Sequence, residues 1–202
     1  MTTLVEAAGG QELRPPTHPV PKWALALPVL VVIAATATAA GLVTIGKSPK
    51  TASATGGVAR VGQPAPAFSS WDLGGSKVQL ADFKGRPVLL TFWATWCTAC
   101  QDELPALQRI RDRYQPTGFT VLAVNYKETN YARLSQYLAG LHLNLEAVID
   151  PEGAIATAYG VDIGLPINVL LDRRGTVSQI IVGAVSSSAL ESAVSRVAGP
   201  TT

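Results

Sequence analysis

Two cysteines separated by two residues, Cys97 and Cys100, constrain the possible fold of this chain more than any other feature. They are the only cysteines in its 202 residues. The apolar run before them, Val88–Trp93, is typical of a buried strand, and residues 101–114 after them have helical character. A Cys-x-x-Cys at a strand-to-helix junction indicates a redox-active pair.

The spacing of apolar residues along the rest of the chain predicts an α/β domain. Strands that alternate with helices and end in a hairpin and a helix favour a mixed central sheet flanked by helices. Further strands are expected at residues 119–124, 145–149, 167–171 and 176–182, and further helices at 129–140, at 152–159 and from Ser187 or Ser188 to 197.

The N-terminal part of the sequence predicts that this domain is exported. Residues 1–22 are rich in proline, glycine and small polar residues, as in a disordered tail. Residues 23–45 carry no charge, and as a helix they would extend about 35 Å, enough to cross a membrane core of ~30 Å. The small residues at 35–39 also fit the cleavage site of a secretory signal, so a transmembrane anchor and a cleaved signal both stay open. A flexible linker at 46–60 then precedes a domain at 61–199.

Charge and histidine content argue against several classes of function. The 16 Lys and Arg residues nearly balance the 14 Asp and Glu residues, and no basic patch of the kind that binds nucleic acid is visible. His18 lies in the predicted tail and His142 stands alone between apolar residues, so the cysteines lack further metal ligands. Gln101 follows Cys100, so the c-type haem signature is absent. We therefore expect no metal and no cofactor besides the Cys97–Cys100 disulfide itself.

The positions of the two cysteines predict different roles in thiol-disulfide exchange. Exchange needs a thiolate that attacks and a second thiol that resolves the mixed disulfide. Cys97 stands at the start of the helix, where the helix dipole and unpaired N–H groups lower a thiol pKa, so we expect it to be the nucleophile. Cys100, one turn further, is expected to be less exposed and to resolve the mixed disulfide. A purely structural disulfide and half of a zinc site are the alternatives.

Motifs found between residue 61 and about residue 197 carry a family resemblance. They are Phe92-Trp93-Ala94-x-Trp96-Cys97-x-x-Cys100, then Glu103 and Pro105, Asn125-Tyr126-Lys127-Glu128, Asp150-Pro151-x-Gly153, Tyr159-Gly160-Val161, Leu165-Pro166 and Leu171-Asp172-Arg173-x-Gly175. In this order and combination they closely resemble the TlpA-like thioredoxin family of exported thiol-disulfide oxidoreductases. The segment Asn125-Tyr126-Lys127-Glu128 looks like the one found in the cytochrome-c-maturation branch of that family, the CcmG/DsbE type.

The resemblance implies a thioredoxin-like fold in which the bond before Pro166 is cis and this proline faces the active site. It also implies that Glu103 takes or gives the proton of Cys100, provided that burial raises the pKa of the carboxyl group. An exposed helix glutamate is the alternative interpretation. A substrate groove beside the cysteines is expected from Trp93, Trp96, Thr98, Ala99 and Leu165.

Two positions depart from the family pattern. Ala99 stands where the family commonly has proline, and this position influences the relative stability of dithiol and disulfide. Ile167 and Asn168 follow Pro166, where the cytochrome-maturation branch commonly has Glu-Thr, so a carboxylate is missing from the expected groove. Lys127 and Glu128 are interpreted as residues of a surface loop, with a place in the site as the alternative because they follow the carboxyl end of a strand.

Together these features predict an oxidoreductase of the cell membrane, anchored by a single span with its domain outside the cytoplasm. The family resemblance implies that it reduces disulfides of an exported protein client, such as apocytochrome c or its chaperone, and that a membrane electron donor re-reduces it. A thiol oxidant, a peroxidase and a copper carrier are the alternatives. The peroxiredoxin pattern, however, needs a threonine where Ala94 stands, three residues before Cys97, and the copper carriers use a Cys-x-x-x-Cys spacing.

Overall fold

The computed structural model describes residues 51–200, in which helices connect the strands of a central sheet. The strands are β1 (Ser53–Thr55), β2 (Ala67–Trp71), β3 (Lys77–Gln79), β4 (Val88–Trp93), β5 (Thr120–Tyr126), β6 (Glu146–Asp150), β7 (Ile167–Leu171) and β8 (Val177–Val182). The helices are α2 (Thr98–Tyr114), α3 (Tyr131–Gly140), α4 (Ala154–Ala158) and α5 (Ser187–Ala198), with short 3-10 helices at Leu80–Phe83 (η2) and Gln115–Thr117 (η3).

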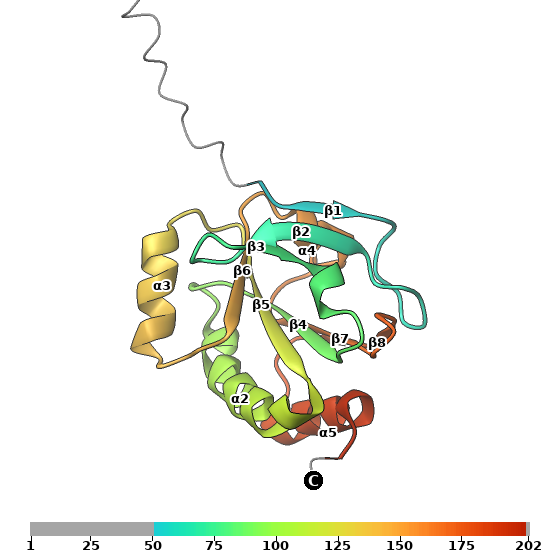
Figure 1. Cartoon of the computed structure of the whole chain (residues 1–202). Helices are drawn as coiled ribbons and strands as arrows, with labels where there is room; N and C mark the ends of the chain where they lie inside the picture. Colours follow the sequence, from blue (N-terminus) through green and yellow to red (C-terminus); the bar gives the residue numbers. More distant parts are fainter. Residues whose placement is uncertain (1–50, 201–202) are drawn as a thin grey trace, which may run out of the picture. The chain divides into compact units, whose positions relative to one another are not determined.

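The central sheet has five strands in the order β6-β5-β4-β7-β8. Strands β4, β5 and β6 are parallel, and α2 and α3 make the crossovers between them. Strands β7 and β8 form a hairpin that adds antiparallel to β4. Helices α2, α3 and α5 pack on one face, and a three-stranded antiparallel sheet, β1-β2-β3, packs with α4 on the other (Figure 1). The expected mixed sheet flanked by helices is confirmed.

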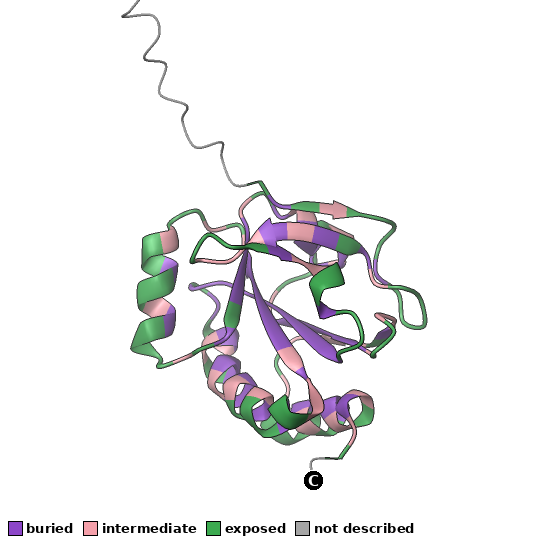
Figure 2. Ribbon diagram, in the orientation of Figure 1, coloured by how far each residue is buried: buried purple, intermediate pink, exposed green. Residues whose placement is uncertain are grey.

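Strand β4 lies in the middle of the sheet and divides the two cores. Because side chains alternate along a strand, Leu89 and Trp93 enter the core beneath the helices, whereas Leu90 and Phe92 enter the core beneath the second sheet. All six residues of β4 are buried, and Figure 2 shows the central strands as the most buried part of the domain. A strand covered on both faces carries a continuous apolar run, as its sequence indicated.

The N-caps of two helices show where those helices begin. Helix α2 begins at Thr98 with Cys97 as its N-cap, which confirms the expected position of Cys97 at the helix start. Helix α5 is capped by Ser186, whose Oγ accepts a hydrogen bond from the Ala189 N–H at 3.2 Å. The prediction that Ser187 or Ser188 caps this helix is therefore wrong by one or two residues.

The prediction of a flexible linker at 46–60 is wrong from residue 51 onward. Residues Ser53–Thr55 form β1, which pairs antiparallel with β2. Further along, the Ala59 N–H donates a hydrogen bond to the Ala158 carbonyl at 2.8 Å. The small residues that suggested flexibility fit closely against the second core, in which Ala52 and Ala59 are buried.

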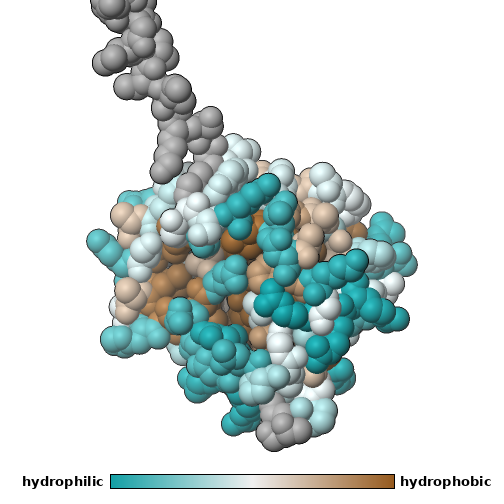
Figure 3. All heavy atoms as spheres, viewed as in Figure 1, coloured by the Kyte–Doolittle hydropathy of each residue, from teal (hydrophilic) through white to brown (hydrophobic). Residues whose placement is uncertain are grey.

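The tail and membrane span predicted at residues 1–22 and 23–45 lie outside the described residues. Within residues 51–200, no helix is both long enough and apolar enough to span a membrane. On the face drawn in Figure 3, apolar side chains are seen mainly in recesses between polar ones. In the described part of the chain, Trp96 and Ile163 are two of the few large apolar side chains that are well exposed. Trp96 directly precedes Cys97, and Ile163 lies three residues before Pro166.

Candidate active site

Cys97 and Cys100 are joined by a disulfide at the start of α2, with an S–S distance of 2.04 Å. The chain turns directly after β4, where the Cys97 N–H donates to the Ala94 carbonyl at 3.1 Å. The Cys100 N–H in turn donates to the Cys97 Sγ at 3.2 Å. An N–H group of the first helical turn thus points at Cys97, an arrangement that stabilises a thiolate there after reduction.

The two sulfur-bearing residues differ in exposure in the predicted direction. Cys97 has 7% of its surface exposed and Cys100 has 1%. Both residues are thus buried, and Cys97 is the more exposed of the two. This asymmetry is what separates an attacking thiol from a resolving thiol.

Glu103 lies one helical turn after Cys100 and is buried. Burial raises the pKa of its carboxyl group above the usual value of 4.5, and the hydrogen bond from Asn168 opposes this rise without cancelling it. The alternative of an exposed helix glutamate is therefore wrong. A carboxyl group with a raised pKa is suited to exchanging a proton with a thiol one turn away.

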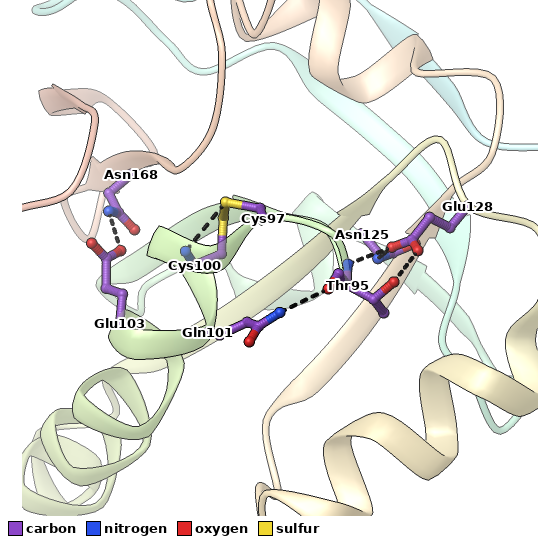
Figure 4. The surroundings of a disulfide bond; sticks show 8 residues. All are labelled: Thr95, Cys97, Cys100, Gln101, Glu103, Asn125, Glu128 and Asn168. Atoms are coloured by element: carbon purple, nitrogen blue, oxygen red, sulfur yellow. Dashed lines mark hydrogen bonds between the residues drawn. A yellow bond between two sulfur atoms is a disulfide. The ribbon is translucent and has the colours of Figure 1, made fainter.

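Asn168 also belongs to this site, although the sequence alone indicated only that it departs from the family pattern. It lies in the middle of the central sheet on β7, paired with Thr91 of β4, and is completely buried. Its Nδ2 donates to the Glu103 Oε1 at 2.6 Å, across 65 positions of sequence. Figure 4 shows Glu103 and Asn168 together on one side of the disulfide. Only the strand register brings these two residues together.

The peptide bond between Leu165 and Pro166 is cis, as expected from the resemblance. Pro166 directly precedes β7, which runs antiparallel to β4, so the proline lies at the sheet edge where β4 ends and the cysteine motif begins. The Pro166 carbonyl accepts a hydrogen bond from the Gly183 N–H at 2.9 Å. Pro166 is buried and Leu165 is half-buried, which leaves part of Leu165 available beside the site.

The remaining residues expected to form a groove are not equally accessible. Trp96 is 64% exposed, Thr98 is exposed and Ala99 is half-buried. Trp93, in contrast, is completely buried and stacks on Tyr137 with the ring centroids 5.8 Å apart. The assignment of Trp93 to a groove wall is therefore wrong, because the last side chain of β4 points into the core beneath the helices.

Glu128 supports the segment that precedes the cysteines. Its carboxylate accepts hydrogen bonds from the Thr95 backbone N–H at 2.8 Å and from the Thr95 hydroxyl. It also accepts from the Asn125 Nδ2 at 2.7 Å, while the Gln101 Nε2 donates to the Thr95 carbonyl at 3.0 Å. Figure 4 shows this cluster on the side of the disulfide opposite Glu103. Glu128 therefore lies in a loop, as expected, but it is half-buried and contacts the segment before the cysteines, whereas Lys127 is exposed.

Within residues 51–200, no group of three or more His, Cys, Asp or Glu side chains is arranged to hold a metal ion. The candidate site is made of the groups already described. They are a sulfur pair that differs in exposure, a buried carboxyl group beside the less exposed sulfur, and a cis-proline at the same sheet edge.

Comparison with known proteins identifies relatives of this domain. The model of the AhpC/TSA family matches residues 61–180. The thiol-disulfide oxidoreductase ResA of Bacillus thuringiensis is 36% identical over 137 residues, which are 68% of this chain and 78% of that protein. The thioredoxin-like protein YneN of Bacillus subtilis is 36% identical over 132 residues, 64% of this chain and 76% of that protein.

A similar fold is found among solved structures. A protein from Chlorobium tepidum, assigned as the thiol:disulfide interchange protein DsbE, superposes with a TM-score of 0.65 and 32% identity. The superposition covers 70% of this chain and 99% of that one. The shared part is the domain that carries the cysteine pair.

Proposed function

The chain belongs to the AhpC/TSA family of thioredoxin-like proteins and is a thiol-disulfide oxidoreductase, and we propose that it reduces disulfides of an exported protein client from the outer face of the cell membrane. The observation that supports this proposal best is the unequal exposure of the two sulfur-bearing residues at the start of α2. It favours ordered exchange with a large partner over a static structural disulfide.

The proposed reaction begins with the reduced protein. The Cys97 thiolate attacks one sulfur of the client disulfide, forms a mixed disulfide and releases the other client sulfur as a thiolate. Cys100 then loses its proton, attacks the Cys97 sulfur and displaces the second client thiolate. Two electrons have passed to the client, and the Cys97–Cys100 disulfide has formed.

Glu103 is proposed to receive the proton that Cys100 loses. The support is its position one turn after Cys100 and the raised pKa that follows from its burial. General acid–base assistance of this kind typically contributes a factor of about 10²–10⁴ in rate. No charged neighbour is needed for it, because burial is the main cause of the raised pKa.

The donor and the client are proposed from the sequence. An N-terminal span at residues 23–45 would hold the domain close to a membrane protein that supplies electrons. Proteins named ResA and DsbE among the relatives support a redox role of this kind. A cytochrome c maturation client is the finer proposal, although Ile167 and Asn168 replace the Glu-Thr of that branch. A peroxidase role is disfavoured by Ala94, three residues before Cys97.

The experiment that tests this function uses the full chain with either cysteine replaced. Cys100→Ser leaves the attacking thiol but removes the resolving thiol, so it is expected to accumulate a mixed disulfide with a disulfide-containing client. Cys97→Ser is the matched control and is expected to trap none. Absence of trapping by both variants, or trapping by Cys97→Ser alone, would show that the assigned order of attack is wrong.

A further inference from the structure

The contact between Glu103 and Asn168 leaves two buried oxygen atoms without a partner. In this contact the Asn168 Nδ2 donates to the Glu103 Oε1 at 2.6 Å. The Glu103 Oε2 and the Asn168 Oδ1 are both buried and have no hydrogen-bond partner of normal geometry, although the Val185 backbone N–H lies close enough to the carboxylate to oppose the rise of its pKa. Each atom is an acceptor when the carboxyl group is ionised, so neither can satisfy the other. Buried polar atoms are usually paired, so this pair of unpaired acceptors calls for an explanation.

One added proton would give both atoms a partner. A protonated carboxyl group has one O–H donor, and an amide group has a carbonyl acceptor beside its N–H donors. The two groups can therefore form a cyclic pair, with the amide N–H donating to one carboxyl oxygen and the carboxyl O–H donating to the amide oxygen. Turning about the terminal bonds of the two side chains, whose torsions are broad, would bring the unpaired atoms together.

We propose that Asn168 is a positioning residue that accepts a hydrogen bond from protonated Glu103, so that Glu103 keeps the proton given up by Cys100 while the protein is oxidised. The proposal rests on the proposed role of Glu103. When Cys100 attacks, its proton passes to the Glu103 carboxylate, which becomes a carboxylic acid paired with Asn168. When a donor dithiol later breaks the disulfide, Cys100 leaves as a thiolate and takes the same proton back. The carboxylate that remains accepts the Asn168 N–H, so one amide side chain serves both states.

The surroundings of Glu103 fit this storage of a proton. Cys100 lies one turn before Glu103 on the same helix, and the groups that interact with the carboxyl group are Asn168 on β7 and the backbone of Val185 before α5. Burial raises the pKa of Glu103, and the only opposing influences are Asn168 and, more weakly, Val185. Among the described residues, no charged side chain contributes to this pKa shift. These surroundings therefore favour the neutral form of the carboxyl group more than water does.

The test is the infrared difference spectrum between the oxidised and reduced full chain near neutral pH. The expected result is a carbonyl band of a protonated carboxyl group in the oxidised state that disappears on reduction. Glu103→Gln should abolish this band, and Asn168→Leu should move it to higher frequency because the hydrogen bond to the amide is lost. Asn168→Thr retains a hydroxyl acceptor and should give a smaller shift, which keeps the test decisive if the leucine variant does not fold. Asn144→Ala, at an exposed asparagine before β6, is the matched control and should leave the band unchanged.

A second readout is the rate of disulfide reduction. Asn168→Leu is expected to slow the reduction of a model disulfide about tenfold at neutral pH, with no further loss in a Glu103→Gln background. Absence of the carboxylic band from the oxidised wild type, or an unshifted band in Asn168→Leu, would overturn the proposal. The infrared test needs no client, because the disulfide is reduced chemically. A band that behaves as expected in a protein that traps no client would therefore support the stored proton and contradict the proposed function.

Discussion

Glu103 is buried where an ionised carboxylate is poorly solvated, and this has a consequence for stability. Because burial raises its pKa above 4.5, the folded protein takes up this proton at a higher pH than the unfolded chain does. The contribution of Glu103 to stability is therefore complete below about pH 4.5 and is lost as the pH rises through the folded-state pKa. At neutral pH the group destabilises the fold, and its retention there fits a role in proton exchange.

We therefore predict that Glu103→Gln stabilises the oxidised protein at pH 7 and has little effect below pH 4.5. Glutamine keeps the shape of the side chain and an oxygen that can accept from Asn168, but it cannot ionise. Urea unfolding at pH 7 and pH 4 measures the difference, with Glu152→Gln at an exposed position as the control. An equal change in unfolding free energy at both pH values would contradict the raised pKa.

Sequence reasoning found the residues of this site that a local motif defines. Cys97, Cys100 and Glu103 follow one another at fixed spacing on one helix, so a single motif was enough. Asn168 joins them through the register of β7 against β4, which sequence spacing does not reveal. Trp93 was predictable as an aromatic of the motif, but its full burial depends on the helices that cover β4.

At the scale of elements, the segment between β4 and α2 is held by a carboxylate from the loop after β5. Glu128 accepts from both the N–H and the hydroxyl of Thr95 and from the side chain of Asn125. Hydrogen bonds to a charged group contribute more than neutral ones, and their loss leaves partly buried donors unpaired. This loop therefore fixes the entry of the chain into the cysteine motif.

We predict that Glu128→Ala lowers the free energy of unfolding by about 2–3 kcal/mol and slows disulfide exchange. The nearby Thr129→Ala, at an exposed position, should change stability by less than about 0.5 kcal/mol. Urea unfolding and the rate of reduction of a model disulfide are the two measurements. A Glu128→Ala protein as stable as the control variant would show that this network does not hold the motif.

The cap of α5 allows a test of where that helix begins. Ser186→Ala is expected to lower stability by about 1 kcal/mol, because the Ala189 N–H loses its acceptor. Ser187→Ala removes a hydroxyl one residue later, inside the first turn, and should have little effect. Thermal or urea unfolding compares the two variants. The reverse order of effects would restore the boundary predicted from sequence.

Element types were predictable where apolar residues recur with the period of a helix, as in α2, or form a continuous run, as in β4. Some short elements were not, because they depend on partners distant in sequence. Strand β1 has three residues and exists through its pairing with β2, so its own small residues indicated a linker. Ser186, Ser187 and Ser188 are equally good caps by residue type, and only the backbone distinguishes them.

For the whole molecule, the proposed membrane anchor makes a prediction about the full chain. The chain should remain with membranes after an alkaline wash, while Val32→Arg together with Ile33→Arg should release it. Each arginine at the centre of a span is unfavourable by about 2.5–3.5 kcal/mol on insertion scales. Recovery of a soluble wild-type chain shortened at its N-terminus would instead support a cleaved signal.

The architecture of the domain was predictable at this scale because strands and helices alternate and the cysteine motif fixes one junction between them. The order β6-β5-β4-β7-β8 and the two cores on opposite faces agree with a thioredoxin-like fold, and the similarity to the Chlorobium tepidum protein covers almost all of that chain. The direction of electron flow is set by the relative stability of the dithiol and the disulfide, and we expect Ala99 and the proposed storage of a proton at Glu103 both to affect it.

The reduction potential of the Cys97–Cys100 pair, measured by equilibrating the full chain with a glutathione buffer, tests the central claim most directly. A protein that reduces clients should have a potential near that of thioredoxin, about −270 mV. A value near that of DsbA, about −120 mV, would make the protein an oxidant and contradict the proposed function.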